Sequence, residues 1–207
     1  MKKFSALILL LLIVCLAACG AEADTETTTT EPTTAETTTA ATPAHDFSGL
    51  YVFTADASNA AALGEAYSWF PEYGVEFALV LTLDEQGNAV LDLRISSVEE
   101  IEAALFEKAN RESAEAYGMS YEDYYAMLLT EMGSEEAIRE NFRHTHTGAL
   151  PDIQSKLIDS FPLSGVYRAD GESVTVTLGD YEMILVLDGE SLATEFNGCT
   201  ATFLRQG

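Results

Sequence analysis

The stretch "SVTVTLGDYEMILVLDGESLATEFNGCTATFLR" (residues 173–205) decides the fold, because apolar and polar residues alternate along most of it. Asp-Gly at 188–189 and Asn-Gly at 197–198 interrupt this alternation, and both dipeptides tolerate the positive φ of tight hairpin turns. A further Asp-Gly at 170–171 precedes the stretch. The pattern predicts an antiparallel meander whose strands are residues 173–178, 183–187, 192–196 and 199–205.

Residues 47–96 show the same period of two, so we expect this segment to be mostly strands. Every second residue from Val75 to Leu83 is apolar, and so is every second residue from Leu91 to Ile95. The sequence "DEQGN" at 84–88 is typical of a turn. These features predict a hairpin with one buried face and one wet face.

The period becomes helical between about residues 97 and 160. Ser97 and Glu100 match a capping box at the start of the first helix. Gly118 and Gly133 divide the segment, which predicts three helices and a further short helix near its end. Three tyrosines of the second helix share one side, which we expect to pack against the sheet: Tyr121, Tyr124 and Tyr125.

The rhythm of Asp-Gly and Asn-Gly turns in residues 167–205 resembles the lipocalin-like (calycin-like) domains of bacterial surface lipoproteins. Gly49-Leu50-Tyr51 resembles the Gly-x-Trp that opens a lipocalin barrel, and Arg205 resembles the basic residue that packs over that aromatic ring. The resemblance implies an α+β fold, an antiparallel sheet or partial barrel with a helical insertion at about 97–160. The family mostly lacks an assigned activity, so the resemblance informs the fold more than the function.

The beginning of the chain has the pattern of a signal peptide. Lys2 and Lys3 precede an apolar run over residues 4–18, which as a helix reaches about 22 Å, short of the ~30 Å hydrocarbon core of a membrane. The following Leu16-Ala17-Ala18-Cys19 resembles a bacterial lipobox, in which the cysteine thiol receives a diacylglyceryl group. The resemblance implies a signal peptide over 1–18, lipid attachment at Cys19, and a cell-membrane anchor on the extracytoplasmic face.

Residues 19–46 are expected to form a disordered tether behind the lipidated cysteine. Positions 25–42 hold eleven threonines, three glutamates, three alanines and one proline, with no apolar period. A flexible chain of this length spans roughly 30 Å. The remaining residues, 47–207, are enough for a single domain with its own core.

The composition excludes some partners. Without Lys2 and Lys3, eight of the ten basic residues remain against 34 acidic ones, a formal charge of −26. A chain this acidic repels nucleic acid, so we expect no nucleic-acid partner. After removal of the signal peptide and lipidation of Cys19, Cys199 is the one remaining cysteine, so we expect no internal disulfide. Cys199 lies in an alternating, strand-like run, which predicts a small buried residue, with a nucleophile as the alternative.

Few residues suggest chemistry. His144 and His146 form an H-x-H motif. On a strand the two side chains share a face and can bind one metal, whereas on a helix they point in different directions. Since the motif ends a predicted helix, the alternative is that its basic side chains interact with the negative end of the helix dipole. Glu107 with Arg111 and Lys108 with Glu112 have the spacing of helix-surface ion pairs. No calcium loop, zinc motif or hydrolase motif is present, so we predict no enzyme, and assign no catalytic, metal or cofactor-binding residue.

Two functions follow as the main hypotheses. The first is a non-catalytic binding module for a small apolar or glycan ligand on the concave face of the sheet. Its segment "AYSWFPEYG" (66–74) is an aromatic platform for the ligand, or a structural segment that plugs the barrel end or packs on the helical block. The alternative is a ligandless envelope interaction protein with a packed core and an unknown protein partner; a hydrolase that uses scattered carboxylates ranks third. A cavity of several hundred cubic ångströms favours the first hypothesis, and a filled interior favours the second.

The lipobox interpretation predicts the effect of Cys19→Ala. Without the thiol no diacylglyceryl group is attached, and the protein is expected to leave the membrane fraction, because each buried CH₂ of the lipid contributes roughly 0.8 kcal/mol to anchoring. Fractionation of cells that express either form measures this. Unchanged membrane association of the variant contradicts the interpretation.

Overall fold

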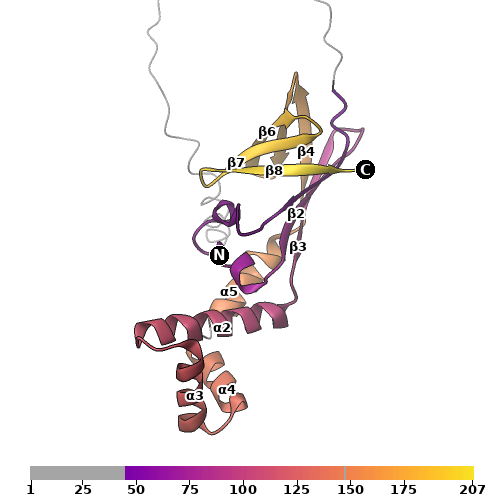
Figure 1. The fold of residues 1–207 in the computed structure, drawn as a ribbon. Coiled ribbons are helices and arrows are strands. Elements are labelled where there is room, and N and C mark those ends of the chain that lie inside the picture. The colour runs from indigo at the N-terminus through magenta and orange to yellow at the C-terminus, as the bar shows by residue number, and fades with distance from the viewer. Residues whose placement is uncertain (1–44, 147) are drawn as a thin grey trace, which may run out of the picture.

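The computed structural model describes residues 45–146 and 148–207 (Figure 1). The predicted signal peptide, the predicted lipid attachment at Cys19 and nearly all of the predicted tether lie outside the described residues.

Eight strands and four α-helices make up the described chain. The strands are β1 (Gly49–Thr54), β2 (Phe77–Leu83), β3 (Asn88–Ile95), β4 (Leu163–Asp170), β5 (Ser173–Leu178), β6 (Tyr181–Asp188), β7 (Ser191–Phe196) and β8 (Cys199–Gln206). The helices, all between β3 and β4, are α2 (Val98–Ala116), α3 (Tyr121–Met132), α4 (Glu135–Thr145) and α5 (Ala149–Lys156), and the 3-10 turn η4 (Ile158–Ser160) follows them.

The strands form a closed antiparallel barrel. Each strand pairs with the next along the chain, and β1 pairs with β8 to complete the ring. The predicted antiparallel meander is therefore confirmed. The sequence predicted either a sheet or a partial barrel, and the structure shows that the barrel is closed. The alternation follows the prediction on β5, where Val174 and Val176 are buried and Thr175 between them faces outward.

The prediction that residues 47–96 are mostly strands was wrong for the segment between β1 and β2. This segment contains two 3-10 helices, η2 (Ala60–Leu63) and η3 (Pro71–Tyr73). Gly64 and Gly74 follow these turns with positive φ, and Pro71 begins the second one, so the backbone cannot remain extended.

The insertion has the helices that the sequence predicts, with the expected caps. Ser97 accepts a hydrogen bond from the Glu100 N–H, and the Glu100 carboxylate accepts one from the Ser97 N–H, which completes the capping box of α2. The hydroxyl oxygens of Ser120 and Ser134 cap α3 and α4, since each accepts a hydrogen bond from the backbone N–H three residues further on. Gly133 ends α3 in the left-handed conformation.

The prediction that the tyrosines of α3 pack against the sheet was wrong. Tyr124 stacks on Tyr117 of the α2 terminus with 5.8 Å between ring centres, and Tyr121 lies 4.9 Å beneath the Arg111 guanidinium of α2. Tyr125 meets Phe106 of α2 edge to face. Helical spacing places these rings on one side of α3, but it does not specify which element covers that side.

Helix α2 packs against the barrel core and against the helices that follow it. Ile101 and Ala104 near its beginning belong to the main hydrophobic core, which fills the barrel and continues into its helical end. Phe106, further along α2, is buried outside that core and meets Tyr125 of α3 and Phe142 of α4 edge to face. We call residues 106–145 the helical arm, and Figure 1 shows α3 and α4 on the side of α2 away from the barrel.

Neighbouring residues of β6 provide a test of the barrel interior. Leu185 is 0 % exposed, whereas Ile184 next to it is 53 % exposed on the outside. We expect Leu185→Ala to lower the free energy of unfolding by about 3 kcal/mol, and Ile184→Ala to lower it by less than about 1 kcal/mol. Urea denaturation of residues 45–207, which contain every strand and every residue of the main core, measures both. Equal losses contradict the assigned orientation of β6.

Candidate functional site

The middle of the barrel is filled by its own side chains. A residue that lined a cavity wide enough for water would expose area to that water, yet many inward residues expose none. Six of them, contributed by five strands, are each 0 % exposed: Leu81, Val174, Val176, Leu185, Leu192 and Phe203. This part of the barrel therefore has no room for a ligand.

One end of the barrel is sealed by the residues that begin β1 and end β8. The Arg205 guanidinium lies 5.8 Å from the centre of the Tyr51 ring and donates a hydrogen bond to the Ser48 carbonyl. Gly49, at φ +149°, leaves space for this side chain, because a Cβ there would lie 3.1 Å from Arg205 Nε. The contact that the resemblance implied for Gly49, Tyr51 and Arg205 is thus present.

The Tyr51 hydroxyl completes this seal. It donates a 3.1 Å hydrogen bond to the carbonyl of Phe47, whose own ring is buried. Burial raises the pKa of Tyr51, and the nearby Arg205 acts in the opposite direction. A tyrosine hydroxyl is protonated at neutral pH even at its ordinary pKa of about 10, so it remains a hydrogen-bond donor to the Phe47 carbonyl.

The aromatic segment 66–74 plugs the opposite end. Phe70 is 0 % exposed in the main core, and Trp69 meets it edge to face with 4.7 Å between ring centres. The Trp69 indole N–H donates to the Ala66 carbonyl, and Tyr67 and Tyr73 pack against the same core. The plug that the sequence offered as one alternative is what the structure shows.

Asn197 ties the β7–β8 turn to η2, which precedes this plug in the chain. Its amide donates a 2.9 Å hydrogen bond to the Ala62 carbonyl of η2, and its backbone has a positive φ of 50°. The Asn-Gly motif predicted the turn, but nothing in the sequence indicated this second contact, since its partner is 135 residues away.

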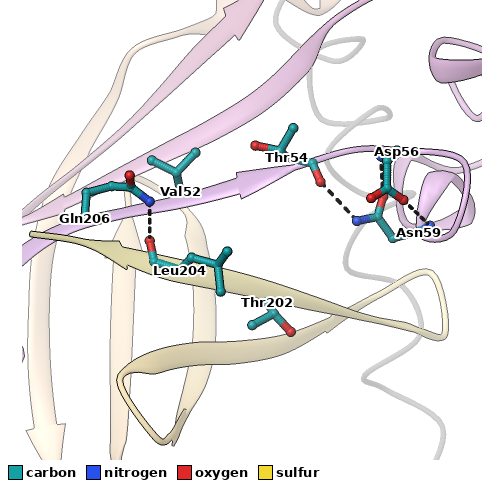
Figure 2. A pocket seen from close by; sticks show the side chains of 7 residues that line it. All are labelled: Val52, Thr54, Asp56, Asn59, Thr202, Leu204 and Gln206. Atoms are coloured by element: carbon teal, nitrogen blue, oxygen red, sulfur yellow. Dashed lines mark hydrogen bonds between the residues drawn. The ribbon is translucent and has the colours of Figure 1, made fainter.

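A shallow hollow of about 400 Å³ lies on the outside of the barrel, where β1 meets β8 (Figure 2). Val52 and Leu204, which face each other across the two strands, are its apolar lining. The polar lining comes from Thr54, Asp56, Asn59, Thr202 and Gln206. The Ser58 hydroxyl and N–H hydrogen-bond the Asp56 carboxylate and hold its pKa below the usual range, so this rim stays anionic.

The residues singled out for chemistry do not converge. His144 lies in the last turn of α4 and His146 caps it, stacked on Phe142 at 4.4 Å, so the H-x-H sits at a helix end and not on a strand. Cys199 begins β8, half-buried against the core, away from both histidines in the chain. In residues 45–146 and 148–207, no three His, Cys, Asp or Glu side chains are arranged to hold a metal.

The predicted ion pairs of α2 are confirmed. Arg111 contacts Glu107 at 2.8 Å, and Lys108 contacts Glu112 one residue further on. All four side chains are partly exposed, so each pair contributes a few tenths of a kcal/mol to the helix. These pairs support α2 and do not form a catalytic arrangement.

No protein-family model, no curated protein and no solved structure matches the chain. The described part of the chain has no helix that is both long and apolar enough to cross a membrane. The function is therefore inferred from the geometry of the described residues.

The barrel has two different ends. At one end, which we call the chain-entry end, β1 begins at Gly49, which pairs with Leu83 of β2. Strand β8 finishes at the same end, where Gln206 pairs with Leu50 of β1. The helical insertion leaves from Ile95 at the opposite end, where β3 pairs with Phe77 of β2. Figure 1 shows this separation, with the helices below the barrel and the C-terminus at its upper part.

The seal at the chain-entry end predicts a loss of stability in Arg205→Ala. The variant removes a charge-assisted hydrogen bond and a cation–π contact, and we expect it to lower the free energy of unfolding by about 1–2 kcal/mol. Arg168→Ala is the matched control, because this exposed arginine of β4 makes no hydrogen bond or ion pair with any residue that the structure describes. Urea denaturation at equal salt compares the two, and similar losses contradict the seal.

Proposed function

We propose that this chain is a lipid-anchored, extracytoplasmic interaction protein with a lipocalin-like barrel that is filled by its own side chains. The observation that carries the proposal is the set of inward residues with 0 % exposure, including Leu185 and Phe203. A small-molecule site normally needs a concavity of several hundred cubic ångströms, and the middle of this barrel offers none. Binding therefore takes place on the outer surface, and the barrel is a scaffold.

The two ends of the barrel support display away from a membrane. The predicted tether reaches the domain just before Gly49, and the lipobox resemblance assigns the anchor to Cys19. The helical arm extends from the opposite end (Figure 1). The arm therefore lies at the end of the barrel opposite the one where the described chain enters β1.

The alternative function is binding of a small apolar or glycan ligand outside the barrel. The hollow beside Val52 and Leu204 supports it, since an apolar lining and an anionic rim at Asp56 lie together there. The hollow is open to solvent, in contrast to the enclosed pockets that retain small ligands through purification.

Native mass spectrometry of residues 45–207, purified without detergent, tests whether the barrel retains a small ligand. We expect the mass of the polypeptide alone, because the filled core leaves no internal site. A denaturing spectrum of the same sample is the control that identifies covalent additions. A persistent non-covalent addition, lost on denaturation, contradicts the interaction protein and favours the small-ligand function.

A further inference from the structure

Helix α3 exposes an unusual amount of apolar surface. Eight of its 12 residues are apolar or aromatic, yet Tyr124 is its only buried residue. A helix on a protein surface normally buries one apolar stripe and presents polar residues elsewhere. Leu129 is 38 % exposed, and Tyr117, which precedes α3, is 70 % exposed. The described residues therefore cover the apolar surface of this helix only in part.

Tyr117 and three apolar residues of α3 lie side by side, and they differ in exposure: Tyr117 is exposed and Tyr124 is buried. Tyr117 stacks on Tyr124 with 5.8 Å between ring centres and 23° between ring planes. Met127 and Leu128 follow Tyr124 by three and four residues, so they lie on the next turn beside it, and both are half-buried. We call these four residues the arm strip. Methionine adapts its shape to different partners, which suits a docking surface.

Carboxylates flank the arm strip. Asp123 and Glu131 lie four residues before and after Met127, one turn away on the same side of α3, and both are exposed. The helix contains no lysine or arginine. An occupant of the strip therefore meets apolar groups in the centre and negative charge at the edges.

The cations of the insertion are already engaged. Residues 98–145 contain 12 acidic and four basic side chains. Each basic side chain pairs with a glutamate of the insertion: Lys108 with Glu112, Arg111 with Glu107, Arg139 with Glu135, and Arg143 with Glu102. In the described chain no cation pairs with Asp123 or Glu131, so their charge is available to a partner.

We propose that the arm strip binds a cationic amphipathic helix of a partner protein. The apolar face of that helix covers Tyr117, Met127 and Leu128, and its lysines and arginines meet the flanking carboxylates. This inference rests on the proposed function, because it places binding on the outer surface. A second copy of this chain would bring like charges together, and anionic lipid would be repelled, so neither fits the strip as well.

A designed peptide tests the proposal. The probe is a fluorescent synthetic helix of about five turns, made of leucine and lysine with leucine at helical spacing, and its control is a scrambled peptide of identical composition. Residues 45–207 are titrated into each peptide and the anisotropy is measured. We expect the amphipathic peptide to bind at least about tenfold more tightly, and its affinity to fall as salt rises.

Matched variants locate the site. Tyr117→Ser with Met127→Ser removes apolar groups from the arm strip, whereas Ile184→Ser with Val186→Ser removes two exposed apolar groups from β6, and neither pair changes the charge. We expect at least about a tenfold loss of affinity in the arm variant and less than about a twofold change in the barrel variant. Circular dichroism checks that the helices persist. If they do not, Glu131→Lys, with the exposed Glu190→Lys as its control, tests the same surface, and a loss in Glu131→Lys alone supports the strip.

Three results overturn the proposal. Equal affinity for the two peptides indicates general charge attraction, and equal losses in the arm and barrel variants do the same. A dimer in sedimentation that disappears in the arm variant assigns the strip to a second copy of the chain. Failure of the proposed function is distinguishable, because it appears as a bound small molecule in native mass spectrometry whatever the peptide result.

Discussion

The pairing of β1 with β8 is the constraint on which the rest of the structure depends. Its register places Tyr51 opposite Arg205, and this pairing turns a meander of neighbouring strands into a ring without an open edge. Closure also gives the inward residues of every strand a common interior. The seal at the chain-entry end uses the same two strands, since Arg205 of β8 covers Tyr51 of β1.

A closed ring of eight strands is just wide enough for side chains to fill it. Here phenylalanine, leucine and valine occupy that space, and the aromatic segment 66–74 and the side chain of Phe47 lie at its two ends. The interior is thus filled by side chains that stabilise the barrel. The first part of the long helix α2 contributes Ile101 and Ala104 to the barrel core, and Phe106 further along it packs against α3 and α4.

Local signals predicted much of the fold. Asn197 and Gly198 specify their hairpin because both adopt the positive φ that few other residues accept, and Gly189 does the same in the β6–β7 turn. Ser97 with Glu100 specifies the start of α2 because the capping hydrogen bonds are local. Predictions of which element packs against a given surface were less successful, because that depends on residues far away in the sequence. The side of α3 that carries Tyr121 and Tyr124 was correctly identified as one surface, but it covers α2 and not the sheet. The sequence did not predict the arm strip either, because the exposure of Tyr117 depends on how the other helices are arranged around it.

The sequence by itself determined the antiparallel strands, their turns, the helical insertion and the acidic character of the chain, because each depends on residues close together or on composition alone. It also carries the lipobox-like Cys19 and the Thr-rich segment, which lie outside the described residues. Only the tertiary structure decided closure of the barrel, the filling of its interior and the separation of the chain-entry end from the helical arm. These features depend on contacts such as Arg205 with Ser48 and Asn197 with Ala62, whose partners are 157 and 135 residues apart and which no local pattern specifies.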